Sequence, residues 1–209
     1  MHLNEKKCQQ LIIDSQKCQR NWDTTRVIPQ EHIELFKVAA TQCPSKQNYA
    51  FYNLKFVTDR SVIEKLHDNT NPENKFGFGM PDGKFYTCPQ SLANLVIVFG
   101  YSIPWAKQTD KDKYGHKNYP FKRDADISIG IALGYLFYIA NSLGYKTGGC
   151  NFKEMEESRL ALNESKDYTP VTMLGIGYPD ESKNLREHHT VPEFTFPHKE
   201  KEHIEIEFI

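Results

Sequence analysis

The chain has 209 residues, which is about the length of one domain and enough to bury a substantial core. Its 26 basic and 27 acidic residues give a formal net charge of −1, and this balance argues against bulk electrostatic binding to nucleic acid. The 13 Phe, 11 Tyr and 2 Trp residues allow a stacking pocket, although aromatic residues this numerous mostly fill a core.

The cysteines and the apolar runs indicate a cytoplasmic protein. Five cysteines are widely spread, with no Cys-x-x-Cys pair and no Cys/His spacing typical of zinc, so we expect reduced thiols and no metal. Residues 1–10 lack the apolar region of a signal peptide. The longest nearly apolar run, residues 127–140, is too short to span a bilayer comfortably and predicts a buried helix.

The first half of the chain predicts helices separated by one strand. Residues 4–18 favour a helix with one apolar face. Pro29 is a good start for a second helix, and Pro44 gives that helix a reason to end, because proline disfavours helical geometry in the residue before it. Residues 54–57 suit a short strand, and Asp59 can cap a helix that follows it.

Two polar excursions flank a strand in the middle of the chain. Residues 68–91 are rich in Asn, Gly and Pro and indicate a loop. Residues 95–99 form a continuous apolar run with β-branched side chains, as in a central strand covered on both faces. Residues 102–123 form a second long polar stretch, and loops of this length are often functional lids or else mobile.

The last third predicts the longest helix and two strands. Residues 124–144 are apolar nearly all round, so this helix should be buried on more than one side. Residues 171–177 indicate an inner strand. Residues 203–208 alternate polar and apolar side chains, and a terminal strand there needs a neighbour, for which a partner subunit is one candidate. We expect one α+β domain over residues 1–209.

Two segments of the first 50 residues could bind a ligand. Lys17 and Arg20 are three positions apart near a helix end, so they can face the same way and suit a phosphate; a solvated helix end is the alternative. The turn at residues 44–48 could expose backbone amides to a planar or anionic ligand, or it could be an ordinary connection.

Two further segments follow the longest helix. Gly144 fits a helix C-cap, and Gly148 and Gly149 would let the backbone approach a ligand. Residues 175–179 end a strand and lead into a basic loop that contains the adjacent pair His188 and His189. Adjacent histidines rarely chelate one ion, and no acidic or thiol partner is spaced to help them. A plain turn and a solvated loop are the alternatives.

Taken in order, the four segments resemble the nitroreductase family of flavin mononucleotide (FMN) enzymes. The family's Arg-Arg-Ser-x-Arg-x-Phe is similar to residues 16–22, and its Pro-Ser-x-x-Asn turn to residues 44–48. Its long central helix resembles residues 126–144, and its Val-Gly-Tyr-Pro resembles residues 176–179. The chain departs from the family at Gln16, Cys18 and Phe51-Tyr52, where the family has Arg, Ser and Pro-Trp; Lys17 would compensate for the lost charge.

The resemblance implies an α+β nitroreductase-like fold, with a central mixed or antiparallel sheet flanked by helices and a long buried central helix. It also implies an intertwined homodimer with FMN at the subunit interface. The phosphate and ribityl chain would be held by Gln16, Lys17, Cys18, Arg20, Lys183 and Arg186. The other subunit would line the flavin ring with Pro44, Ser45, Lys46 and Asn48, while Gly148 and Gly149 would offer backbone N–H groups and Gln90 would contact the polar edge of the ring.

The implied activity is hydride transfer from NAD(P)H through FMN to a nitroaromatic, a quinone or a similar acceptor, in a ping-pong scheme without a catalytic side chain. A substrate lid is expected from Trp105, Tyr114, Tyr119 and Phe121, with a surface excursion as the alternative. Three other functions stay open: a sibling reaction on the same fold, such as reductive dehalogenation or flavin breakdown; storage or sensing of FMN without turnover; and a chain that has lost FMN.

Overall fold

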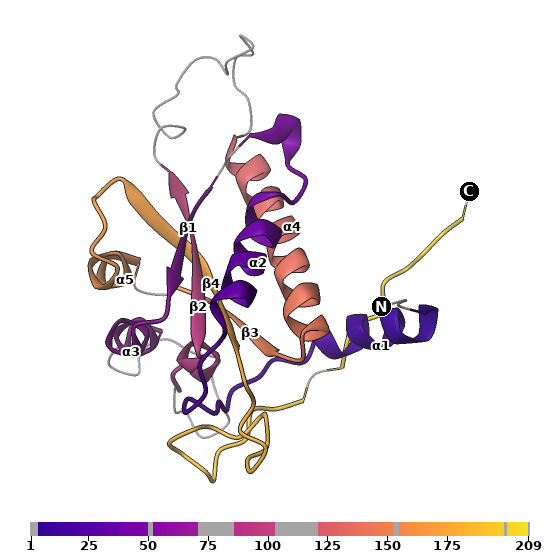
Figure 1. Cartoon of the computed structure of the whole chain (residues 1–209), viewed down its shortest axis with the longest axis vertical. Helices are drawn as coiled ribbons and strands as arrows, with labels where there is room; N and C mark the ends of the chain where they lie inside the picture. The colour runs from indigo at the N-terminus through magenta and orange to yellow at the C-terminus, as the bar shows by residue number, and fades with distance from the viewer. Residues whose placement is uncertain are drawn as a thin grey trace.

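The computed structural model describes residues 4–49, 52–70, 86–102, 121–152, 155–198 and 200–208. Figure 1 shows a sheet with helices on both of its faces, an α+β arrangement as predicted. The elements are α1 (Glu5–Ser15), α2 (Gln30–Thr41), the short 3-10 helix η1 (Lys46–Asn48), β1 (Tyr52–Val57), α3 (Arg60–Asp68), the 3-10 helix η3 (Pro89–Leu92), β2 (Leu95–Ser102), α4 (Phe121–Ser142), β3 (Lys146–Asn151), α5 (Met155–Ala161) and β4 (Tyr168–Gly177).

The sheet has the strand order β1-β2-β4-β3, and all three neighbouring pairs are antiparallel. This confirms the antiparallel form of the expected sheet. The two central strands are the ones whose sequences are most continuously apolar, because each of their faces meets a helical layer. The edge strands β1 and β3 are less completely buried.

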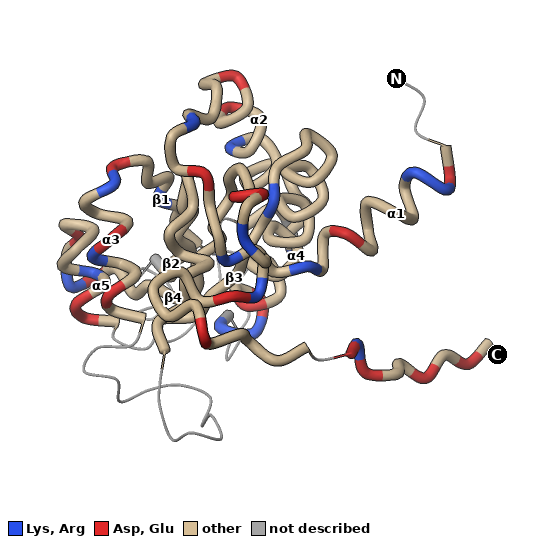
Figure 2. Tube along the Cα trace, turned by 90° about the horizontal axis from the view of Figure 1, so that it is seen from below, with Lys and Arg blue, Asp and Glu red and all other residues tan. Residues whose placement is uncertain are grey.

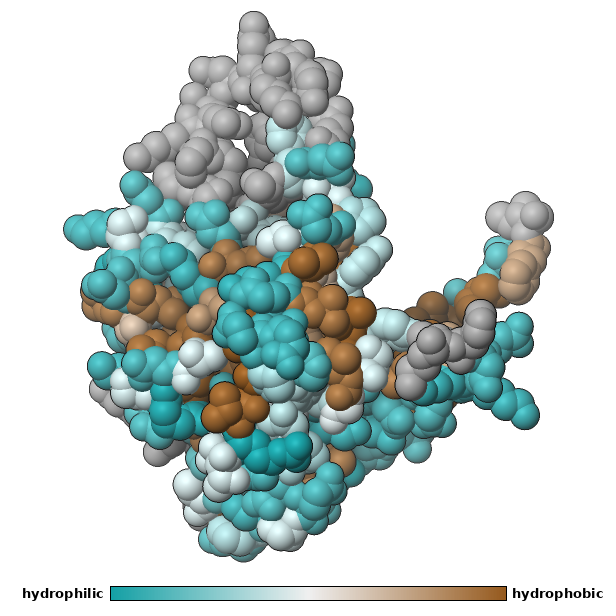
Figure 3. All heavy atoms as spheres, viewed as in Figure 1, coloured by the Kyte–Doolittle hydropathy of each residue, from teal (hydrophilic) through white to brown (hydrophobic). Residues whose placement is uncertain are grey.

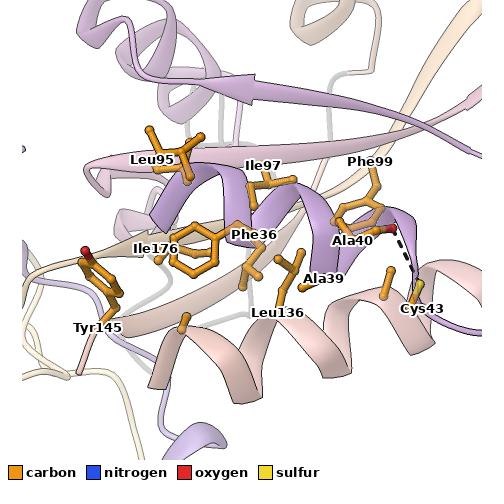
Figure 4. Packing of buried hydrophobic residues seen from close by; sticks show 14 of the residues in the cluster. Phe36, Ala39, Ala40, Cys43, Leu95, Ile97, Phe99, Leu136, Tyr145 and Ile176 are labelled. Carbon is orange, nitrogen blue, oxygen red and sulfur yellow. Dashed lines mark hydrogen bonds between the residues drawn. The ribbon is translucent and has the colours of Figure 1, made fainter. Parts of the chain in front are cut away.

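Successive side chains of β2 enter two different cores. Residues Leu95, Ile97 and Phe99 pack toward α2 and α4, whereas Val96 and Val98 belong to the cluster on the side of α3. Alternation with period two requires this division when both faces are covered. Figure 4 shows Phe36 of α2 among residues of the sheet and of α4. The prediction of a strand covered on both faces is confirmed.

The helix ends follow the sequence signals. Pro29 directly precedes α2, and α2 ends at Thr41, before Pro44. Asp59 caps α3 by accepting hydrogen bonds from the backbone N–H groups of Ser61 and Val62. Gly144 follows α4 with a φ of 87°, a left-handed conformation that favours glycine. These predictions are confirmed. Each of them depends only on residues that are neighbours in the sequence.

Helix α4 is apolar on two faces but buried on one. Its buried stripe faces α2 and the sheet and consists of Ala125, Ile129, Ala132, Leu136 and Ala140. Ile127 is 50% exposed and Tyr135 is 46% exposed on the other side, so one chain alone leaves part of the apolar surface uncovered. The helix is long and apolar enough to span a bilayer by length and composition, but a core helix meets the same criterion.

Three segments differ from the expectations. Residues 146–151 form a strand where a glycine-rich turn was the open alternative, because hydrogen bonds to β4 outweigh the weak strand propensity of glycine. Helix α5 was not predicted. Residues 203–208 show no strand and are exposed, and Figure 1 shows this end of the chain projecting from the body. Figure 2 shows acidic and basic residues interspersed along the chain, in keeping with the balanced charge.

Candidate functional site

The segment that leaves α1 crosses the end of the sheet. Cys18 forms a parallel bridge with Thr147, and the backbone N–H of Gln19 donates to the Thr147 carbonyl at 2.9 Å. Farther along, Trp22 bridges Pro179. Through these backbone contacts three of the four predicted ligand segments, around residues 18, 147 and 179, lie side by side.

Arg20 and Arg186 meet at Phe196. The guanidinium carbon of Arg20 lies 4.4 Å from the centre of the Phe196 ring, and its Nη1 donates to the Cys18 carbonyl at 3.1 Å. The Nε of Arg20 is buried without a hydrogen-bond partner. Arg186 donates through its own Nε to the Phe196 carbonyl at 3.0 Å. Two cations, one with an unused buried donor, therefore share Phe196 as a neighbour, and an arginine with a free donor suits an anion.

Lys17 and Lys183, the two lysines predicted to help hold the phosphate, are exposed, and each forms an ion pair with a nearby aspartate. Lys17 Nζ lies 2.7 Å from Asp14 Oδ1, and Lys183 Nζ lies 3.7 Å from Asp180 Oδ2. Gln16, which precedes Lys17, is exposed. Both ion pairs are solvent-exposed and therefore weak, so either lysine could exchange its carboxylate for a phosphate.

Cys18 faces the glycine pair of β3. Burial raises the pKa of the Cys18 thiol, while the nearby Arg20 charge and a hydrogen bond with the backbone of Gly149 act in the opposite direction. Because the Gly149 N–H is the donor in that bond, it points toward the Cys18 sulfur rather than away from the chain. A serine hydroxyl at position 18 would accept the same hydrogen bond.

Gln90 lies over the glycine pair from η3. Its Nε2 donates to the Gly149 carbonyl at 3.4 Å, whereas its Oε1 is buried without a hydrogen-bond partner. A Cβ placed on Gly148 would lie 2.5 Å from the Gln90 Cβ and 2.6 Å from the Gln19 carbonyl oxygen. Position 148 therefore admits only glycine, and the glycine serves close packing of Gln90 on the sheet.

The turn at Pro44 lies elsewhere in the chain. Lys46 Nζ is 3.6 Å from Asp124 Oδ2, in the first turn of α4, and the Asp124 carboxylate is buried while Lys46 is half-exposed. Helix α4 has 22 residues and is thus about 33 Å long, and Thr147 follows its other end. Pro44, Ser45, Lys46 and Asn48 are consequently not brought to Arg20 within one chain; the two groups flank opposite ends of α4 (Figure 1).

The proposed lid falls almost entirely on residues that the structure does not describe. Trp105, Tyr114 and Tyr119 lie outside the described residues, and Phe121 is the first residue of α4. Among the residues that are described, no group of three or more His, Cys, Asp or Glu side chains could hold a metal ion.

Two asparagines that sequence reasoning missed hold the site segments together. Asn21 donates through Nδ2 to the carbonyls of Asn184 at 2.7 Å and Glu187 at 2.9 Å. Asn94 donates to the Asp23 carbonyl at 2.8 Å and accepts from the Tyr178 N–H at 3.0 Å. Their partners are distant in sequence, so no local pattern could have revealed these roles.

No family model matches the sequence, and no curated protein matches it. Solved structures do match. A putative nitroreductase in complex with FMN from Exiguobacterium sibiricum is 18% identical, with a TM-score of 0.64 over 84% of this chain and 90% of that one. The hypothetical oxidoreductase YcnD from Bacillus subtilis is 21% identical, with a TM-score of 0.64 over 86% of this chain and 68% of that one.

A putative NADH oxidase from Clostridium acetobutylicum is 20% identical, with a TM-score of 0.58 over 94% of this chain and 99% of that one. Similarity at this level of identity establishes the fold. The chain therefore has the nitroreductase fold, as the resemblance implied.

Proposed function

We propose that this chain, whose fold is that of the nitroreductases, is an FMN-dependent NAD(P)H oxidoreductase that works as a homodimer. The observation that carries the proposal is that Arg20 and Arg186 both contact Phe196 while Gln90 contacts Gly149, on a fold that also occurs in a putative nitroreductase in complex with FMN. The unpaired buried atoms, Arg20 Nε and Gln90 Oε1, are polar groups that a bound ligand would satisfy.

The residues at this end of the sheet fit the polar parts of FMN. Arg20 and Arg186 would bind the phosphate, with Lys17 and Lys183 adding charge from the rim. Gln16 and Cys18 would line the ribityl chain. Gln90 would donate or accept at the polar edge of the ring. Gly149, which is exposed, would present its backbone to the cofactor, and Gly148 would act indirectly by allowing Gln90 to pack closely on the sheet.

The remaining part of the site would come from a second copy. Lys46 and its turn lie at the far end of α4 in one chain, so an antiparallel arrangement of two α4 helices would carry the partner's turn toward Arg20. This assigns Pro44, Ser45, Lys46 and Asn48 to the wall of the partner's cofactor site. The proposed dimer thus explains why the predicted cofactor residues are divided between two ends of one helix.

Exposed apolar surface supports an association of this kind. Ile12 of α1 is 61% exposed, Val38 of α2 is 53% exposed and Ile127 of α4 is 50% exposed. Figure 3 shows apolar residues at the surface over α2 and α4. Gly130 and Gly134, on the exposed side of α4, have no atom within 4 Å of an added Cβ and would allow a second helix to approach closely. The exposed segment 203–208 would lie on the partner.

FMN would supply the hydride chemistry, accepting hydride from NAD(P)H and passing it to a nitroaromatic, quinone or similar acceptor in a ping-pong cycle. The side chains would orient the cofactor and shape the pocket. Lys46 would offset negative charge at the polar edge of the ring, and the buried carboxylate of Asp124 would hold its ammonium there. The five cysteines are free, which agrees with placing the enzyme in the cytoplasm.

The proposal is tested on the purified full chain. We expect a yellow protein that releases FMN on denaturation and that oxidises NADH or NADPH steadily when a quinone is supplied. Bound FMN without turnover on quinones or nitroaromatics would instead favour a storage or sensing protein. A colourless protein that takes up no added FMN would overturn the proposal.

A further inference from the structure

Three histidine side chains gather on the side of the sheet where α3 and η3 meet the loop after β4. His67 comes from the last turn of α3 and is 6% exposed, and His188 of the loop is 4% exposed. The ring of His189 lies 4.9 Å from that of His67 and 4.5 Å from that of His188, measured between ring centres. The function proposed above does not use this cluster.

The hydrogen bonds of His188 require its neutral form. Its Nδ1 accepts the backbone N–H of Thr190 at 3.3 Å, so this nitrogen carries no proton, while Nε2 lies 3.3 Å from the hydroxyl of Thr87. A proton added to Nδ1 would face the Thr190 N–H and eliminate that hydrogen bond. The neutral ring is therefore the form that fits the fold.

The surroundings of His67 and His189 would also do little to stabilise an added proton. His67 uses Nδ1 to reach the Cys88 carbonyl at 3.2 Å and the Ser91 hydroxyl at 3.1 Å, and the Nδ1 of His189 is buried without a partner. A second positive charge within 5 Å of the first would add repulsion. Among the described residues no carboxylate forms an ion pair with these rings, and burial of an unpaired charge is costly, so the cluster should remain neutral while it is closed.

The charged groups around the cluster do not make the protonated form of the histidines favourable. On α3, Glu64 and Asp68 favour protonation of His67, whereas Arg60 opposes it; from the loop, Lys183 opposes protonation of His189. Cys88 and Ser91 face His67 from the η3 side, and Tyr86 and Thr87 face His188. Burial is the largest influence, and it lowers the pKa of His188 to about 4 and that of His189 to about 3.

The same loop presents Arg186 and Phe196 to Arg20. Backbone hydrogen bonds join Arg186 to Phe196 and His188 to Phe194, so residues 186–196 form a closed loop with His188 on its inner side. Phe194 stacks on Tyr86, with ring centres 3.9 Å apart. Opening of this loop would remove Phe196 from Arg20 and Arg186 from the proposed phosphate site.

We propose that His67, His188 and His189 form an acid-sensitive clasp, and that protonation of the released histidines opens residues 186–196 and loosens the anion-binding pair Arg20 and Arg186. The identity of the anion as FMN phosphate rests on the proposed function; the opening of the loop does not. A released histidine binds protons with an ordinary pKa near 6.5, so opening becomes more favourable as the pH falls below that value. Each released histidine shifts the opening equilibrium about 30-fold between pH 8 and pH 5.

The test measures hydrogen exchange at the backbone amides of His188 and Phe196 in the full chain between pH 8 and pH 5, corrected for intrinsic exchange. Opening of residues 186–196 releases the two histidines of the loop, His188 and His189, so we expect the opening equilibrium to rise by up to about 1,000-fold in the unmodified chain. The rise should be about 30-fold less in His189→Phe, which keeps an aromatic ring and loses no hydrogen bond. The exposed His198→Gln serves as the matched control and should behave like the unmodified chain.

FMN release, followed by the fluorescence of free flavin over the same pH range, provides the second measurement. The clasp is supported if FMN release follows the opening of residues 186–196 and if release and opening both shift to lower pH in His189→Phe. Acid-induced opening in a chain that never binds FMN would retain the clasp and reject the proposed function. Unchanged exchange down to pH 5, or the same pH dependence in His189→Phe, would overturn the clasp.

Discussion

The guanidinium of Arg20 lies over the ring of Phe196, with the Arg20 Cζ 4.4 Å from the ring centre. This contact joins the segment after the first helix to the loop after the last strand. Arg186 donates to the carbonyl of the same Phe196, so one aromatic residue positions both arginines. The anion site proposed here therefore depends on the loop after β4 as much as on the N-terminal motif.

Replacement of Arg20 should weaken FMN retention while the fold persists. A hydrogen bond to a charged group contributes about 1.5–3 kcal/mol, so Arg20→Ala should raise the Kd for FMN at least about 10-fold, and Arg20→Lys should recover part of the loss. Equilibrium dialysis with fluorescence detection measures the change. Lys37→Ala, which removes an exposed cation paired with Glu34 on α2, is the control. Full FMN occupancy in Arg20→Ala would contradict the assigned role.

The two adjacent glycines of β3 should respond differently to alanine. Gly148→Ala places a methyl group 2.5 Å from the Gln90 Cβ, so η3 must move, with a loss of stability and of FMN affinity. Gly149→Ala meets only the Phe137 ring at 3.6 Å, an ordinary contact, and should leave the fold intact. Urea denaturation of the two variants measures the difference. Equal midpoints would show that Gln90 is not held as described.

An acidic side chain on the exposed face of α4 should dissociate the proposed dimer, and the same variant should lose FMN. Ile127→Glu acts at a residue that is 50% exposed in one chain, so it should disturb the monomer little. Leu160→Glu on α5 is the matched control, because Leu160 is 60% exposed on the opposite side of the sheet. Light scattering measures the oligomeric state, and the flavin content of the purified protein measures bound FMN. A monomeric Ile127→Glu that keeps FMN tightly would refute the shared site.

The core between α2 and the sheet should be sensitive to truncation. Phe36 is fully buried, and Phe36→Ala should lower the free energy of unfolding by about 3–5 kcal/mol. Its neighbour Leu35 is 38% exposed, and Leu35→Ala should cost less than about 1 kcal/mol in the monomer. Urea denaturation at protein concentrations low enough to prevent dimerisation compares the two. Similar costs would mean that Phe36 is not the central residue of this core.

Local signals in the sequence were sufficient for the helix ends and the central strands. Pro29, Asp59 and Gly144 act through their own backbone geometry and their immediate neighbours, so their roles can be predicted without tertiary structure. The apolar run 95–99 requires cover on both faces wherever it lies. Strand β3 was not predictable in this way, because its glycines are extended only through pairing with β4.

The candidate site was predictable as a set of segments but not as a geometry. Arg20 and Arg186 were expected near one phosphate, yet Phe196, which positions both, carried no signal. Asn21 and Asn94 were missed because an amide that binds distant carbonyls looks like any polar loop residue in sequence. In sequence the adjacent pair His188 and His189 raises only the question of a metal site, because the packing of His67 against it exists only in the folded chain.

The sequence by itself determined most of the helices and strands, their order and the residue types available for an anion and a flat ring, because these depend on periodicity, capping and side-chain chemistry; α5 and β3 are the exceptions. Only the tertiary structure decided which of those residues meet. Packing of α4 along the sheet separates Lys46 from Arg20, and closure of residues 186–196 over the histidines brings Arg186 and Phe196 to Arg20. Contacts between residues far apart in the chain have no local signature, and they arise from the fold as a whole.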